Sequence, residues 1–182
     1  MKNIKQSIRS EQIEEPLSEY ENYEFINCTF SDLTGIDFIN CNFINCNLSN
    51  LKFNNSRLQD ISFTECKMLG INFSQSSNFG FSIIFENCIL DYASFDRKKM
   101  NKSVFKNCRL PRVNFTESDL SKIKFINCDL QDTIFSKSNL EGVDFRTTVN
   151  FSIDPENNNV KKAKFSRDNL EGLLTKHNII ID

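Results

Sequence analysis

Cysteine is the residue type in this chain with the widest range of possible chemistry. Seven cysteines occur among 182 residues, enough for disulfides, a metal centre or a reactive thiol. Six of them recur about every 20 residues, and we expect these to form one inward-facing column: Cys28, Cys46, Cys66, Cys88, Cys108 and Cys128. The sequence has no Cys-x-x-Cys pair, which a zinc site would favour. We therefore expect reduced, packed thiols acting as small apolar side chains, with no metal site.

Other catalytic groups are sparse in the sequence. The single histidine, His177, lies near the end of an expected terminal helix, where a cation is favoured by the helix dipole. The five glycines are scattered and form no phosphate-binding loop. Neither a Gly-x-Ser-x-Gly nor a His-Glu-x-x-His motif is present. The sequence therefore predicts no catalytic residue, no cofactor and no enzymatic activity.

A period of five residues organises most of the chain. An apolar residue occupies every fifth position from Phe85 to Phe145, and an earlier run from Leu33 to Phe73 keeps the same period in another phase. This period matches neither a helix nor a straight strand. The simplest arrangement is a coil with four repeats and about 20 residues per turn, each turn stacked on the next at ~4.8 Å. Such repeats bury their apolar sides only by stacking on one another.

The period also predicts the core. One wall should carry Phe25 followed by a column of Phe43, Phe63, Phe85, Phe105, Phe125 and Phe145. The opposite wall should carry Phe53, Phe73, Phe95, Phe115 and Phe135. The two remaining walls carry mostly Leu or Met, with the small cysteines and serines alternating with the large residues, as close packing requires.

Triplets with a small residue two positions before a central Leu or Phe recur along the coil. They include Cys46-Asn47-Leu48, Ser118-Asp119-Leu120 and Cys128-Asp129-Leu130. In these triplets the chain resembles the pentapeptide repeat family over roughly residues 20–150. The resemblance implies an all-β solenoid, a right-handed quadrilateral parallel β-helix. The tail pattern adds a short C-terminal helical cap.

Three regions are expected along the chain. Residues 1–19 form an N-terminal leader or cap, 20–150 the β-helix, and 151–182 a closing loop, a partial coil, a helix and an apolar tail. Two extra residues enter within 78–82 and predict a bulge with Asn78 facing inward, which is either a tolerated insertion or a re-aimed surface. The tail should cap the last coil or join two copies of the chain through Leu170, Leu173, Leu174, Ile179, Ile180 and Ile181.

Two groups of outward side chains are candidates for a partner surface. Arg97, Lys98, Lys99 and Lys102 form a basic cluster, either a solvated corner or a patch for an acidic partner. Lys98 falls in an inward slot, so we expect its stem along the core edge and its ammonium in water. A second group places aliphatic residues where the repeat prefers Asp or Asn: Ile84, Ile89 and Val104.

A column of corner residues is also evident: Asn27, Asn45, Glu65, Asn87, Asn107 and Asn127. Asparagine tolerates turn geometry, and stacked amides can hydrogen-bond along a column.

The tail segments 153–155, 170–174 and 177–182 are similar to the end of the quinolone-resistance branch of the family. That resemblance implies a DNA-mimicking rod that engages DNA gyrase or topoisomerase IV, affects quinolone susceptibility and dimerises through its C-terminal ends. The alternative is a structural scaffold with another protein partner. A net charge of −2 is neither the basic balance of a nucleic-acid binder nor strongly acidic. With no long apolar stretch and no signal peptide, we expect a cytoplasmic protein that binds neither membrane nor DNA directly.

Overall fold

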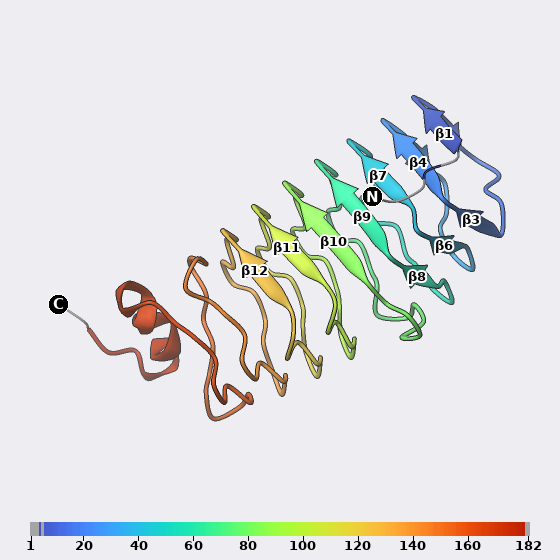
Figure 1. The fold of residues 1–182 in the computed structure, drawn as a ribbon. Coiled ribbons are helices and arrows are strands. Elements are labelled where there is room, and N and C mark those ends of the chain that lie inside the picture. The colour runs from blue at the N-terminus through green and yellow to red at the C-terminus, as the bar shows by residue number, and fades with distance from the viewer. Residues whose placement is uncertain (1–3, 5, 181–182) are drawn as a thin grey trace.

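The computed structural model describes residues 4 and 6–180. Its main feature is a stack of coils, of which those up to β12 each contribute one strand to a seven-stranded sheet in the order β1-β4-β7-β9-β10-β11-β12 (Figure 1). These strands are β1 (Gln6–Arg9), β4 (Tyr23–Ile26), β7 (Asn42–Ile44), β9 (Ile61–Thr64), β10 (Ile83–Glu86), β11 (Val104–Lys106) and β12 (Lys124–Ile126). Every strand pairing in this sheet is parallel. The predicted all-β solenoid is confirmed.

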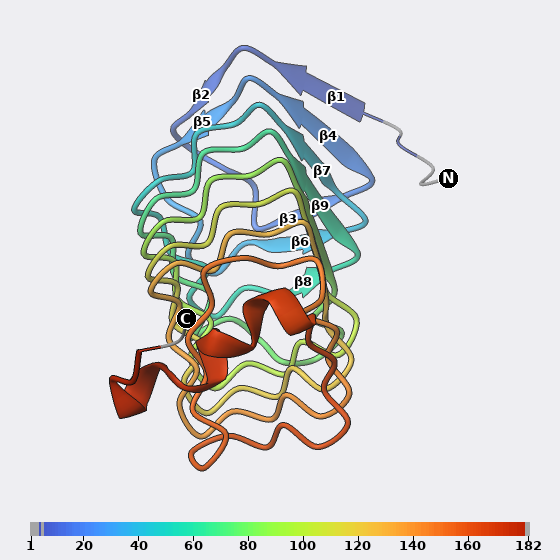
Figure 2. The same ribbon diagram turned by 90° about the vertical axis from the view of Figure 1, so that its left-hand side faces the viewer.

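Two smaller sheets complete the first coils. They contain β3 (Glu19–Glu21), β6 (Asp37–Ile39) and β8 (Leu58–Gln59), and β2 (Gln12–Ile13) with β5 (Thr29–Phe30). Elsewhere the sides of the coil are joined by isolated parallel bridges about one turn apart, such as Ile89 with Arg109. Viewed from the C-terminal end, the turns nest as four-sided loops (Figure 2). We call the side of the rod formed by the seven-stranded sheet the sheet face, and the adjoining side, which carries the inward cysteines, the cysteine face. The far face lies opposite the sheet face and carries the inward rings of Phe53, Phe73, Phe95, Phe115 and Phe135. The remaining side is called the serine face.

The register explains the period of five. Phe43 pairs with Phe25 on one side and Phe63 on the other, and the same register continues to Phe125. Rings on the sheet face stack with centroids 4.6 Å apart at Phe85–Phe105, and rings of the far face meet them edge to face. Both arrangements suit aromatic quadrupoles. All the phenylalanines assigned to the core, and all six column cysteines, are buried.

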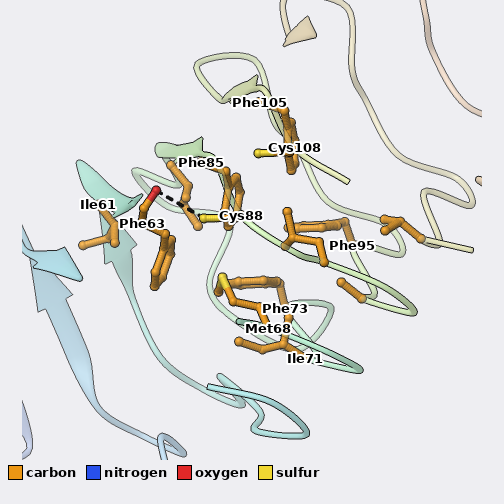
Figure 3. Close-up of a cluster of buried hydrophobic side chains, with 14 of the residues drawn as sticks. Ile61, Phe63, Met68, Ile71, Phe73, Phe85, Cys88, Phe95, Phe105 and Cys108 are labelled. Carbon is orange, nitrogen blue, oxygen red and sulfur yellow. Dashed lines mark hydrogen bonds between the residues drawn. The ribbon is translucent and has the colours of Figure 1, made fainter. Parts of the chain in front are cut away.

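Figure 3 shows how the sulfurs fit this packing. The Cys88 thiol lies 3.4 Å from the carbonyl oxygen of Phe63 in the preceding turn, and Cys128 makes the same contact with Phe105. All seven cysteines are buried. The seventh, Cys41, lies outside the column and points at the carbonyl of Tyr20. The thiols thus fill small slots beside the rings.

Asparagine builds one corner of the coil. Asn27, Asn45, Asn87, Asn107 and Asn127 all adopt left-handed φ angles between 51° and 55°, a conformation that Asn tolerates better than most residues. Their side chains also bond along the axis: the Nδ2 of Asn107 donates to the Oδ1 of Asn87 at 3.2 Å, and Asn127 donates to Asn107 at 3.3 Å. Both explanations for the Asn column therefore hold together.

The coil begins before the expected boundary at residue 20. β1 pairs with β4 over four residues, and Ile13 is buried in the first turn. The segment 6–19 is therefore the first coil of the stack rather than a leader outside it.

The two-residue insertion differs from its prediction in one respect. Asn78 was expected to face inward, but it is exposed, and the inward slot of that turn holds Ser76. The extra residues form a turn around Gly80, whose φ is +69°, and push the Phe79 ring outward to 73% exposure. The guanidinium of Arg57 lies 5.1 Å from the centre of that ring. The insertion is thus absorbed as a local projection, which leaves the stack above and below intact.

At the C-terminus the coil continues past Phe145. The Phe165 ring stacks 5.3 Å from Phe145, and the 3-10 helices η1 (Arg167–Leu173) and η2 (Thr175–His177) then cross the end of the stack (Figure 2). Ser166 caps η1 by accepting from the Asp168 N–H, and Asn178 ends η2 in a left-handed conformation. The expected helical cap is present, in 3-10 form. No helix in the described residues is long and apolar enough to cross a membrane.

Candidate interaction surface

Aliphatic side chains project from two adjoining faces of the rod. On the sheet face, Ile84 is 44% exposed and lies in register with half-buried Val104 in the next strand. On the cysteine face, Ile89 is exposed between Lys67 and Arg109. All three residues therefore point outward, as the repeat pattern placed them.

Two further exposed aliphatic residues extend these faces. Ile126 lies on the sheet face and Val149 on the cysteine face. Sequence analysis missed both, although Ile126 stands one position after an inward Phe and could have been found by the same reading. The two faces meet at the hydrogen-bonded asparagine corner, which gives the surface a rigid edge.

Charged side chains alternate in sign along the rod. The Nζ of Lys106 lies 2.6 Å from the Oε1 of Glu86, one turn away. At another corner the Nε of Arg97 lies 3.0 Å from the Oε2 of Glu117, and Arg112 pairs with Asp132 at 3.6 Å. Each of these carboxylates is neutralised by the adjacent coil. The surface is therefore a patchwork here rather than an acidic stripe.

The predicted basic cluster is divided by the fold. Arg97 is engaged with Glu117, Lys99 and Lys102 are exposed, and Lys98 is fully buried. The expectation that the Lys98 ammonium reaches water is wrong, and Lys98 cannot belong to a partner surface. The cause is the insertion in the preceding turn, which turns carbonyl groups toward this inward slot.

The environment of Lys98 is polar but uncharged at contact distance. Its Nζ donates to the carbonyl of Ser76 at 2.8 Å, the Oγ of Ser76 at 3.0 Å and the carbonyl of Ser77 at 3.2 Å. It also lies 4.4 Å from the centre of the Phe81 ring, a cation–π distance. Burial disfavours the charged amine and lowers the pKa of Lys98 to about 8. The hydrogen bonds from Lys98 to Ser76 and Ser77 thus hold the inserted turn against the next coil.

The tail presents an apolar surface at the end of the rod. Leu173 packs against the core, whereas Leu170, Leu174 and Ile179 are exposed and Ile180 is 90% exposed. Ile181 lies outside the described residues. One residue missed by sequence reasoning fixes the cap: Gly172, where a Cβ would lie 2.5 Å from the carbonyl oxygen of Phe151. Only glycine lets η1 approach so closely.

A metal site would need several ligating side chains close together. The described residues contain no cluster of three or more His, Cys, Asp or Glu side chains with suitable geometry. The thiols of the column are apart from water, and burial raises the pKa of Cys128 above its ordinary value. His177 stands in the last turn of η2. The surface features above therefore remain the strongest candidates for function.

Comparison with protein families agrees with this architecture. A model described as a pentapeptide repeat region matches residues 81–152, and one described as pentapeptide repeats (8 copies) matches residues 25–60. Together they cover more than half of the chain. The chain belongs to the pentapeptide repeat family.

Solved structures with a similar fold include a trypsin-treated variant of QnrB1, a plasmid-mediated fluoroquinolone resistance protein. It matches with a TM-score of 0.51 at 20% identity, covering 98% of this chain and 99% of that chain. HetL, a pentapeptide repeat protein involved in heterocyst differentiation regulation from the cyanobacterium Nostoc, matches at 13% identity with a TM-score of 0.43, covering 87% of each chain. The QnrB1 match shows a shared fold. No curated protein sequence matches this chain.

Proposed function

We propose that this chain is a non-catalytic rod that binds a partner protein through its sheet and cysteine faces. The observation that carries the proposal is the gathering of outward-facing aliphatic residues on these two adjoining faces: exposed Ile84 and Ile126 with half-buried Val104 on one, and exposed Ile89 and Val149 on the other. Exposed apolar side chains that gather on one side of a protein favour an interaction site. Stacked repeats hold such residues on an extended, rigid surface.

A matched pair of variants tests this proposal. Ile84→Asp places a charge on the sheet face, and Ile134→Asp places the same charge on the far face, where Ile134 is 48% exposed. Each immobilised protein would be used to capture partners from an extract of the producing cells, followed by mass spectrometry. We expect wild type and Ile134→Asp to retain the same partner and Ile84→Asp to lose it. Equal capture by all three proteins would refute the assignment of the surface.

The more specific hypothesis makes DNA gyrase or topoisomerase IV the partner, with a DNA-mimicking rod that alters quinolone susceptibility. The full-length fold similarity to QnrB1 supports testing it. The alternating ion pairs at Lys106–Glu86 and Arg97–Glu117 favour the alternative, a structural scaffold with another protein partner. A mimic of DNA needs uninterrupted negative charge, because the duplex carries one charge per ~1.7 Å of its axis.

A supercoiling assay separates these alternatives. Purified gyrase would be assayed on relaxed plasmid with increasing amounts of this protein, with and without a quinolone. Inhibition of supercoiling, or relief of quinolone inhibition, would support the topoisomerase hypothesis. An unchanged reaction at tenfold molar excess would leave the scaffold role. Direct binding of the protein to plasmid, visible as a mobility shift, would contradict both.

We also propose that two copies join through their C-terminal ends. The exposed Leu170, Leu174, Ile179 and Ile180 exceed what the cap needs, and a two-fold contact would cover them in both copies at once. Sedimentation of the intact protein should give a dimer at micromolar concentration, and truncation after Phe165 should give a monomer. A monomeric intact protein would rule out the proposal, and a dimer that survives truncation would place the contact elsewhere.

Finally, we propose a cytoplasmic location. The six free thiols of the cysteine column, packed along the core, suit a compartment in which glutathione and thioredoxin keep cysteines reduced. Fractionation of the producing cells, with the protein detected by antibody, would test this, and recovery with secreted proteins would contradict it.

A further inference from the structure

The sheet face has one seam, between the coil of β12 and the coil that follows. β12 is the last strand of the seven-stranded sheet, and the next bridge on this face joins Asp144 to Lys164. The ring centroids of Phe125 and Phe145 are 5.8 Å apart, the widest stacked step in this column. The hydrogen bonding at the corner changes as well. The Asn107 N–H donates to the carbonyl of Ile126 at 2.8 Å, whereas the Asn127 N–H donates to the Oγ1 of Thr147 at 3.2 Å.

The seam follows from one residue type. The corner column of asparagines is succeeded by Thr147, whose β-branched side chain disfavours the left-handed conformation. Thr147 does not adopt a positive φ, and the positive φ angles nearest to it along the chain are at Gly142 (72°) and Asn150 (59°). The Thr147 hydroxyl then takes the place of a main-chain acceptor. The coil therefore leaves the sheet register at this point.

A slot of about 430 Å³ opens along the seam. One lip carries Lys122, Lys124 and Ile126, and the other carries Gly142, Asp144 and Thr147. Ile123 and Phe125 also line the slot but are only 4% and 3% exposed, whereas the Ile126 side chain on the first lip is 37% exposed. A Cβ added at Gly142 would meet nothing within 4 Å, so the mouth of the slot is open. The slot thus combines one exposed isoleucine with polar and charged lips.

The charge around the slot is mainly positive. Lys122 and Lys124 are exposed on the first lip, and Lys162 and Lys164 are exposed in the coil beyond the second. In the part of the chain that the structure describes, none of these four lysines forms an ion pair.

Two carboxylates oppose this positive charge. The Asp144 carboxylate is held by Arg146 at 2.7 Å, which together with Lys164 keeps its pKa below the ordinary value. Glu141 lies beside Gly142, and exposed Lys161 lies one turn beyond it. With Arg146 and Lys161 counted against these two acids, the four unpaired lysines leave an excess of positive charge at the slot.

We propose that this seam binds an acidic segment of a partner protein, with an apolar side chain of the segment in the slot and its carboxylates on the lysines. The inference rests on the proposed role of the chain as a protein-binding rod. The apolar side chain and the carboxylates of this segment would each be recognised for a physical reason. The exposed Ile126 side chain gains from being buried against an aliphatic side chain, and unpaired lysines attract carboxylates and speed association. Duplex DNA would satisfy the lysines but supplies no aliphatic side chain to cover Ile126.

The probe for this proposal is a fluorescein-labelled peptide with one Leu flanked on each side by four Asp or Glu residues. Fluorescence anisotropy would measure its dissociation constant for the intact protein. We expect saturable binding that weakens at least tenfold in the double variant Lys122→Glu, Lys124→Glu. The matched control reverses two exposed lysines away from the seam, Lys52→Glu and Lys67→Glu, and should bind within twofold of wild type. Circular dichroism would confirm that both variants keep the fold.

A second variant tests the apolar part of the site. Ile126→Ser should weaken the Leu peptide at least threefold and leave an otherwise identical peptide with Gly in place of Leu unaffected. The proposal is overturned if the seam and control variants bind alike, or if the Leu and Gly peptides bind equally to wild type. It is also overturned if a DNA duplex of equal charge binds as tightly as the peptide.

These outcomes are separable from failure of the wider proposal. Loss of partner capture on Ile84→Asp without peptide binding would reject the seam and keep the rod surface. Peptide binding with capture unchanged by Ile84→Asp would keep the seam and reject the aliphatic faces.

Discussion

Replacing Lys98 by Met should change the pH dependence of stability in a defined way. Lys98 is fully buried, and its ammonium is held by the carbonyls of Ser76 and Ser77, the Ser76 hydroxyl and the Phe81 ring. Burial lowers its pKa from 10.5 to about 8. Met keeps most of the volume of the stem and removes the charge. The difference in unfolding free energy between the two proteins therefore isolates this one amine.

The magnitude follows from proton linkage. Below pH 8 the folded and unfolded chains both hold the proton, and the folded state carries the full cost of burying the charge. Between pH 8 and 10.5 the folded chain has lost the proton while the unfolded chain keeps it, so stability rises with pH. At about 1.4 kcal/mol per pH unit, the interval from about 8 to 10.5 corresponds to about 3 kcal/mol.

The assay is urea unfolding followed by circular dichroism at several pH values between 7 and 10.5. Wild type should gain about 3 kcal/mol relative to Lys98→Met across this range. Titration of thiols and tyrosines affects both proteins and cancels in the difference. Lys99→Met, at the neighbouring exposed lysine, serves as the control and should show a constant difference. A constant difference for Lys98→Met as well would refute the buried, charged lysine.

Other changes test the core and the cap. Phe115→Ala removes a buried ring stacked 5.2 Å from Phe95, and should lower the unfolding free energy by about 3–5 kcal/mol. Ile134→Ala, at an exposed site, should change it by less than about 0.5 kcal/mol, and equal effects of the two in chemical unfolding would contradict the stacked core. Gly172→Ala forces a Cβ against Phe151 and should release η1. Limited proteolysis should then cut within 166–180 much faster than in wild type, and an unchanged cleavage rate would show that the contact is not needed for the cap.

The period of five was enough to predict the coil and its core. An odd period requires the chain to turn at every repeat, so residues one turn apart must stack. That constraint alone places Phe85 over Phe105 and Cys88 over Cys108, pairs that the structure brings together. It also predicts the corner asparagines, because the corner needs a residue that tolerates positive φ.

The limits of the coil were harder to predict from the sequence. The segment 6–9 lacks the motif, yet β1 forms because β4 offers it a free strand edge. The tail pattern predicts a short helical cap, but not its 3-10 form. The sequence also does not predict the close approach of Gly172 to Phe151, because this contact joins segments about one turn apart at the end of the stack.

The special sites were decided by the tertiary structure. The period places Lys98 inward, but only the fold shows that the preceding turn, lengthened by two residues, directs its carbonyls at the ammonium. The sequence likewise contains Thr147 as an ordinary outward residue, and the seam appears only when its hydroxyl replaces a carbonyl of the ladder. The physical reason is the same in both cases. A core position depends on its own place in the repeat, whereas these sites depend on how the neighbouring coil, some 20 residues away, departs from it.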